Sequence, residues 1–279
     1  MAYEAEISRE NPTCILFVID QSGSMDEITE AGRSKAAFVA DVLNKTLYTL
    51  ITTCSKSDGV RNYFDVGVIA YAGSQVGSGF GGALSGDIVH PIHAISENTL
   101  RVEERKKKVD DGAGGIVELK TKFPIWFDPK SQGGTPMRAA LRKTMETMFG
   151  WCEQHPGSYP PTILHVTDGQ STDGTPEEMA DGLRQISTKD GPALLFNLHV
   201  NTAAGQEIVF PTSESDLNDD YSRMLFRMSS PLPEHLAKFA GDKGYTIADG
   251  SRGFIFNGDP QCVVDFFEIG TRPRVVADR

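Results

Sequence analysis

Continuous apolar runs alternate along this chain with stretches whose apolar residues recur every three or four positions. The first apolar run, residues 14–19, has the length and continuity of a strand that is buried on both faces. Residues 33–53 predict a long helix, because their apolar positions follow a 3.6-residue period. This alternation predicts an α/β fold, Rossmann-like and doubly wound, with a mainly parallel sheet.

The same alternation continues toward the end of the chain. It predicts further strands at residues 63–71, 161–167, 193–200 and 253–256. It predicts further helices at residues 135–151, 175–187, 236–242 and 259–270. In the polar stretch 201–230 we predict no helix or strand.

Residues 73–134 interrupt this rhythm. Their first ten residues are rich in glycine, and short strands are predicted at 87–92 and 115–124. The charge run 101–108 is interpreted as a solvated face. We therefore predict one domain over residues 1–279, with 73–134 as an inserted β-rich segment that stands off the main sheet.

Composition narrows the possible functions. A formal net charge of −11 over 279 residues argues against nucleic-acid binding, which needs an excess of Lys and Arg. No apolar run reaches the ~18 residues of a membrane helix, and the acidic first ten residues do not resemble a secretion signal. Cys14, Cys54, Cys152 and Cys262 are widely spaced, which favours buried free thiols and a cytoplasmic protein.

Oxygen-bearing side chains stand at three places where strands or Gly-rich turns end. Asp20, Ser22 and Ser24 follow the first strand, Thr135 opens a helix after two glycines, and Asp168 follows another strand. The carboxyl ends of parallel strands meet at one edge of a sheet, where open α/β folds bind their ligands. Hydroxyls and carboxylates suit a hard cation, so we predict a site for Mg²⁺ or Mn²⁺.

The charge of this set suggests what the site does. Only Asp20 and Asp168 are anionic, so they balance a divalent ion without excess. The three hydroxyls are neutral ligands, which would leave the ion Lewis-acidic and with an exchangeable water. An Asp or Glu side chain of a partner protein could replace that water.

Each signal also has a simpler explanation. Asp20, Ser22 and Ser24 alone could form an Asx turn or a helix cap. Thr135 alone could cap its helix, and Asp168 before a glycine is a common turn. The three signals together, in order and each in a suitable local setting, are much more specific.

Three further polar residues are interpreted without metal chemistry. His165 and His199 lie inside apolar strands, which favours satisfied core histidines over a general base. Asp173 could join a second cation site, but a turn leading into a capping box at Thr175 is the simpler interpretation.

The combination Asp20-Gln-Ser22-Gly-Ser24, Thr135 and Asp168 resembles the metal-ion-dependent adhesion site of von Willebrand factor type A domains. The resemblance covers residues 13–270 with interruptions, and it implies that these five residues bind the ion directly or through water. The chain resembles the stand-alone bacterial, intracellular members most. For such members the resemblance implies an adaptor in kinase and phosphatase signalling or beside an AAA-type ATPase.

An enzymatic alternative starts from the same residues. Asp20 after a strand could be the nucleophile of a Mg²⁺-dependent phosphohydrolase. Loops of the haloacid dehalogenase kind carry a second aspartate two residues later, where this chain has Ser22. We therefore expect a protein-binding module that is not an enzyme, with no nucleic-acid or membrane partner.

Overall fold

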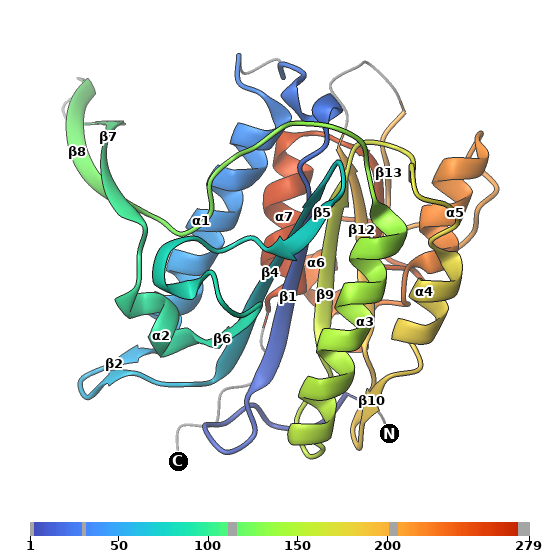
Figure 1. Ribbon diagram of the computed structural model, residues 1–279, viewed down its shortest axis with the longest axis horizontal. Coiled ribbons are helices and arrows are strands. Elements are labelled where there is room, and N and C mark those ends of the chain that lie inside the picture. The colour runs from blue at the N-terminus through green and yellow to red at the C-terminus, as the bar shows by residue number, and fades with distance from the viewer. Residues whose placement is uncertain (1–2, 30–31, 111–115, 201–205, 273–279) are drawn as a thin grey trace.

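The computed structural model describes residues 3–29, 32–110, 116–200 and 206–272. An eight-stranded sheet, called the main sheet below, runs through its centre (Figure 1). Its strands are β1 (Thr13–Asp20), β4 (Phe64–Ala72), β5 (Gln75–Ser78), β6 (Val89–Pro91), β9 (Thr162–Thr167), β12 (Leu194–Val200), β13 (Ile208–Val209) and β14 (Phe254–Gly258).

The strand order is β13-β14-β12-β9-β1-β4-β5, with β6 also paired to β4. The five strands from β14 to β4 are parallel, and the pairs β13–β14, β4–β5 and β4–β6 are antiparallel. After β1 the chain moves outward to β4, and from β9 it moves the opposite way to β12 and β14. The order therefore reverses between β1 and β9, which is where such sheets leave a crevice at their carboxyl ends.

Helices cover both faces of the main sheet (Figure 1). They are α1 (Lys35–Cys54), α2 (Ile92–Glu97), α3 (Met137–Gln154), α4 (Glu177–Leu183), α5 (Asp220–Met228), α6 (Glu234–Asp242) and α7 (Pro260–Gly270), with the short 3₁₀ turns η1 (Gly23–Asp26) and η2 (Gly82–Leu84). One apolar core lies under α1, α2, α6 and α7, and the other lies under α3, α4 and α5. The fold is α/β and doubly wound, and its sheet is mainly parallel, as the alternation in the sequence predicted.

Central strands and long helices formed where the sequence predicted them. Every residue of β1, β9 and β12 is buried, which explains why these strands are continuously apolar instead of alternating. Ser34 caps α1 by accepting a hydrogen bond from the backbone N–H of Ala37, and Asp259 caps α7 through the N–H of Cys262. The expected capping box at Thr175 is wrong, because the N-cap position of α4 is Pro176, which forms no side-chain bond.

The inserted segment differs from the expectation in one respect. Strands β5 and β6 pair with β4 and extend the main sheet, so this half does not stand off it. The hairpin of β7 (Arg101–Asp110) and β8 (Ile116–Ile125) is the part of this segment that forms a separate two-stranded sheet, among its described residues (Figure 1). The charge run 101–108, which we interpreted as a solvated face, lies in strand β7. Its charged residues give no pattern of apolar and polar positions from which a strand could be predicted.

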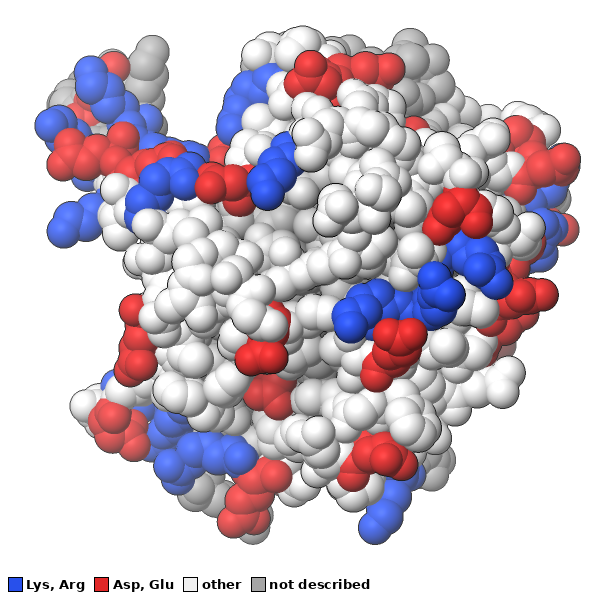
Figure 2. Space-filling model, in the orientation of Figure 1, with Lys and Arg blue, Asp and Glu red and all other residues white. Residues whose placement is uncertain are grey.

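Salt bridges connect the hairpin to the body. Both terminal nitrogens of Arg105 lie 2.9 Å from the carboxylate oxygens of Asp41 in α1, and its guanidinium lies 3.7 Å from the ring centre of Phe123. Figure 2 shows Lys and Arg side chains interleaved with Asp and Glu over the hairpin. A two-stranded hairpin is only marginally stable alone, so these contacts hold its base.

Two smaller features complete the fold. Two-residue strands form the hairpins β2 (Ser55–Lys56) with β3 (Gly59–Val60) and β10 (Ser187–Thr188) with β11 (Gly191–Pro192). The polar stretch where we predicted no element contains strand β13 and helix α5, whose first turn Asp219 caps. Its residues 201–205 lie outside the described residues. In the part of the chain that the structure describes, no helix is both long and apolar enough to cross a membrane.

Candidate metal centre

The five predicted ligands come from three segments at the carboxyl edge of the main sheet. Asp20 ends β1, Thr135 precedes α3, and Asp168 follows β9. Because β1 and β9 are neighbours on either side of the reversal in strand order, the loops that follow them open the crevice together. Ser22 and Ser24 lie in the first of these loops, where the chain turns into η1.

Asp20 is fully buried, and two hydrogen bonds hold its carboxylate. One oxygen accepts from the backbone N–H of Ser22 at 2.8 Å, and the other accepts from the hydroxyl of Thr167 at 2.8 Å. Burial raises the pKa of Asp20 to about 6, although these hydrogen bonds act against the shift. Among the described residues, no basic side chain forms a salt bridge with this carboxylate.

Ser22, Ser24 and Asp168 are in direct contact. The Ser24 hydroxyl donates to one oxygen of Asp168 at 2.6 Å, and the two serine hydroxyls lie 3.2 Å apart. Since the single proton of Ser24 goes to Asp168, Ser22 is the donor between the serines. Ser24 is exposed, so its hydroxyl is accessible to a ligand from solvent.

The hydroxyls of Thr135 and Ser24 both lie beside Gly169. A methyl group built on Gly169 would lie 3.6 Å from the Thr135 hydroxyl and 3.7 Å from that of Ser24. The alternative of Thr135 as a helix cap is wrong. Both carboxylate oxygens of Asp173 instead accept from the first backbone N–H groups of α3, at Arg138 and Ala139.

Backbone contacts hold the Thr135 loop against the first loop. The N–H of Gly23 donates to Gly133 at 2.9 Å, and that of Gln132 donates to Gln21 at 2.9 Å. Gly133 has a φ of +68°, and a side chain there would lie 2.8 Å from the Cα of Gly73. Only glycine fits at position 133, so the Gly-Gly pair before Thr135 is needed for this approach.

Lys35 is a residue of this site that we did not predict. Its side chain is 4% exposed, and its ammonium lies 3.0 Å from Asp168 and 2.6 Å from Glu27. It contacts the second oxygen of Asp168, the one that Ser24 does not use. No motif marks it, because it is simply the first residue of α1, and only the packing of that helix directs it into the site.

The residues present fit a hard divalent cation. Neighbouring ligands of an octahedral ion lie about 3 Å apart when each bond is about 2.1 Å long, which matches the separation of the serine hydroxyls. A buried carboxylate without a basic partner, here Asp20, is costly unless a cation compensates it. Ser22, Ser24 and Thr135 would be neutral ligands, with Asp20 and Asp168 as the anionic ones.

A series of buried polar side chains, joined by hydrogen bonds, lies beside this site. Tyr71 donates to Nε2 of His165 at 2.7 Å, and Nδ1 of His165 lies 2.8 Å from Oδ1 of Asn197. The amide of Asn197 donates to Ser229, so its oxygen is the acceptor and His165 carries its proton on Nδ1. Burial lowers the pKa of His165 to about 4, so the ring is neutral. The interpretation as a satisfied core histidine is confirmed for His165.

His199 and Asp173 are also placed by the structure. The ring of His199 stacks on Phe256 at 4.6 Å and accepts from the N–H of Asn257, and burial lowers its pKa. It is a core residue, as we interpreted it. The carboxylate of Asp173 accepts from the first turn of α3 and from Ser171, as a helix-capping side chain does.

Another cluster of possible ligands lies at the start of α7. One ligand atom each of Glu207, Asp259 and Cys262 lies within 4.8 Å of the others. The Cys262 thiol donates to Glu207 at 3.1 Å, and burial together with this carboxylate raises its pKa far above the usual range. A protonated thiol is a poor metal ligand, and Asp259 already caps α7.

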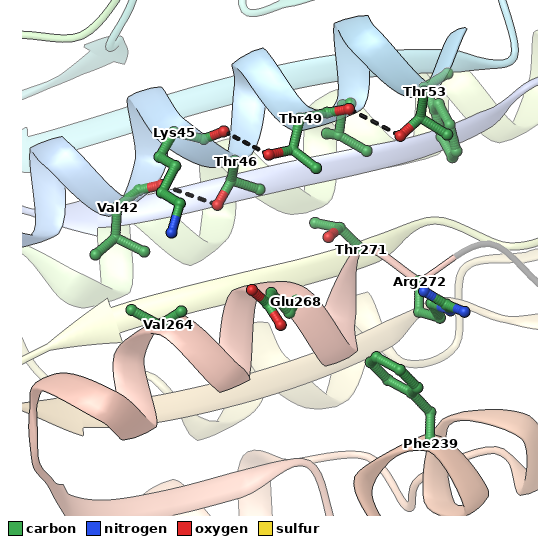
Figure 3. A pocket seen from close by; sticks show the side chains of 12 residues that line it. Val42, Lys45, Thr46, Thr49, Thr53, Phe239, Val264, Glu268, Thr271 and Arg272 are labelled. Atoms are coloured by element: carbon green, nitrogen blue, oxygen red, sulfur yellow. Dashed lines mark hydrogen bonds between the residues drawn. The ribbon is translucent and has the colours of Figure 1, made fainter. Parts of the chain in front are cut away.

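One groove lies beside the metal centre, and a separate cavity lies away from it. A groove of about 320 Å³ between α4 and α5 is lined by Gln170, Ser171, Tyr221, Met224 and Arg227, and it starts two residues after Asp168. A cavity of about 210 Å³ lies between the C-terminal halves of α1 and α7, with α6 beside it (Figure 3). Since these helices begin at the carboxyl edge of the sheet, this cavity is at the opposite edge from the metal centre.

No protein-family model matches the chain, and no curated protein matches it in sequence. Among solved structures, it is similar to the von Willebrand factor domain of the type V pilus tip protein Mfa5 from Porphyromonas gingivalis, with a TM-score of 0.32, 15% identity, and 58% of this chain and 39% of that chain covered.

Two further solved structures show a similar level of likeness. Manganese-loaded TRAP from Plasmodium vivax has a TM-score of 0.34 and 15% identity, with 67% of this chain and 57% of that chain covered. The minor pilin PilB from Streptococcus sanguinis has a TM-score of 0.43 and 11% identity, with 92% and 60% covered. The match spans less than two thirds of the length of each of these three proteins.

Proposed function

We propose that this chain is a protein-binding module of the von Willebrand factor A kind. It binds one Mg²⁺ or Mn²⁺ through Asp20, Ser22, Ser24, Thr135 and Asp168, and it recognises a partner through an Asp or Glu side chain that completes the coordination of the ion. The observation that carries the proposal is the buried Asp20 carboxylate, which lacks a basic partner among the described residues and is followed in the same loop by the paired hydroxyls of Ser22 and Ser24.

The role of binding, and not catalysis, rests on the groups around Asp20. Its carboxylate is bonded to the backbone of Ser22 and to Thr167, neither of which is a general base. His165, two residues before Thr167, is neutral and bonded at both ring nitrogens. From the same resemblance in sequence we propose a cytoplasmic adaptor, in kinase and phosphatase signalling or beside an AAA-type ATPase.

Thermal and chemical unfolding with and without Mn²⁺ tests the metal site. An ion at about 100 times its dissociation constant should add about 2.7 kcal/mol to the free energy of unfolding. We expect this gain in the wild type and its loss in Asp20→Asn and Ser22→Ala. A gain that persists in both variants would refute the site.

The carboxylate preference has a separate test. Water-proton relaxation by the Mn²⁺-loaded protein reports exchangeable water on the ion, and acetate should lower it in a saturable way. Relaxation that does not respond to acetate would contradict the proposed mode of recognition. Turnover of a phosphate ester that is lost in Asp20→Asn would instead support the phosphohydrolase.

A further inference from the structure

Lys35 is an unusual neighbour for a divalent cation. It is the first residue of α1, directly after the cap Ser34, and its side chain is almost completely buried. Buried ammonium groups are rare unless they are paired, and this one is paired with both Asp168 and Glu27. The site therefore contains a fixed positive charge in contact with one of its two anionic ligands.

Among the described residues, the ammonium contacts carboxylates and not the hydroxyls of the site. Its hydrogen bonds within the described residues go to Glu27 and to one oxygen of Asp168, Oδ2. The hydroxyl of Ser22 bonds to that of Ser24, and Ser24 donates to the other oxygen of Asp168, Oδ1. The lysine is thus on one side of Asp168 and the hydroxyl ligands are on the other.

The charge of the centre changes when Lys35 is included. Asp20 and Asp168 together contribute −2, and Lys35 brings the buried total to −1. Glu27 adds a further negative charge, but its side chain is 57% exposed and solvent screens it. With a divalent ion added, the buried part of the centre is positive by one charge and not neutral.

We propose that Lys35 is a built-in cation of the metal centre that lowers its affinity for the metal and raises its affinity for a partner carboxylate. This inference rests on the proposed function. Like charges repel in a poorly solvated site, so Lys35 opposes binding of the ion. The same positive charge, once the ion is bound, attracts the incoming acidic side chain and excludes basic ones.

A purely structural role makes the opposite prediction. If Lys35 only holds Asp168 in place, removing it would disorder a ligand and weaken metal binding. If it acts through charge, removing it would strengthen metal binding. The sign of the change therefore separates the two explanations without any assumption about its size.

Calorimetric titration of the intact protein with Mn²⁺ measures this sign. For Lys35→Met we expect affinity for Mn²⁺ to rise about tenfold, equivalent to about 1.4 kcal/mol. In the Mn²⁺-loaded variant, acetate should bind more weakly, as measured by water-proton relaxation. Weaker Mn²⁺ binding or unchanged acetate binding in Lys35→Met overturns the inference.

Glu27→Gln is the matched variant, and it keeps the measurement informative if Lys35→Met folds poorly. It removes a negative charge from the exposed side of Lys35 and leaves Asp168 in contact with the ammonium. We expect Mn²⁺ affinity to fall about threefold, since the group is solvated. A rise in affinity would contradict a role based on charge.

Failure of this inference can be distinguished from failure of the proposed function. If the wild type does not bind Mn²⁺, or if Asp20→Asn binds it equally well, the metal site itself is wrong. If the wild type binds Mn²⁺, Asp20→Asn does not, and Lys35→Met binds it more weakly, only the role of Lys35 is wrong.

Discussion

At the scale of single residues, the buried carboxylate of Asp20 lowers the stability of the metal-free protein, and the same carboxylate is a proposed metal ligand. Its carboxylate is buried, and its pKa is raised to about 6 because burial disfavours the charged form. Because the pKa of Asp20 is higher in the folded state than in the unfolded state, the contribution of this carboxyl to the free energy of unfolding is present at low pH. It is lost as pH rises from about 4 to about 6. Near neutral pH without metal, Asp20→Asn should therefore be more stable than the wild type by about 1–3 kcal/mol.

Urea unfolding in EDTA and in Mn²⁺ checks this prediction. The advantage of Asp20→Asn should disappear at about pH 4, where the wild-type carboxyl is protonated. In Mn²⁺ the order of stability should reverse, because only the wild type gains binding energy. A variant that is less stable than the wild type in EDTA would show that Asp20 is needed for the fold.

At the scale of elements, the start of α3 depends on a residue from another segment. Asp173 bonds to the N–H groups of Arg138 and Ala139, so it acts as the N-cap from 35 residues away. Replacing a capping side chain by alanine costs about 0.5–2 kcal/mol. We expect that loss for Asp173→Ala in chemical denaturation, with the Mn²⁺-dependent gain retained.

Thr135→Val is the matched control for that prediction. Thr135 has no capping bond to α3, and valine keeps its branched shape. Its stability in EDTA should stay within about 0.5 kcal/mol of the wild type. Its Mn²⁺-dependent gain should be lost. If Thr135→Val lost stability in EDTA and Asp173→Ala lost the Mn²⁺-dependent gain, Thr135 would be the cap and Asp173 the ligand.

At the scale of the whole molecule, the main sheet carries a polar chain through its core. Tyr71 on β4, His165 on β9 and Asn197 on β12 are linked by hydrogen bonds and end at Ser229 after α5. Burial lowers the pKa of His165 to about 4. Its contribution to stability is thus full above about pH 6.5 and is lost as pH falls toward 4.

The change in the free energy of unfolding at acid pH tests the role of His165 in this series of hydrogen bonds. The stability difference between the wild type and His165→Gln should shrink by about 3 kcal/mol between neutral pH and pH 4. Thr144→Val, which removes a buried hydroxyl that does not titrate, should change stability equally at both pH values. A difference for His165→Gln that does not depend on pH would show that burial does not shift the pKa of this histidine.

Much of the fold could be predicted because burial leaves a pattern in the sequence. Strands β1, β9 and β12 are apolar throughout because both faces of the sheet are covered, and α1 has its apolar stripe because one side packs on the sheet. Strand β7 and helix α5 were missed. Charged residues in an exposed hairpin, and a short helix in a polar stretch, carry too weak a hydropathy signal.

The sequence by itself determined which side chains could serve a cation, since hydroxyls and carboxylates follow strand ends and Gly-rich turns. Only the tertiary structure decided which of them meet, and which others join them. Lys35, Thr167 and Asp173 have roles that depend on contacts between distant segments, and no local pattern encodes such contacts. The physical reason is that ligand type is a property of a residue, whereas charge balance and capping are properties of the packed molecule.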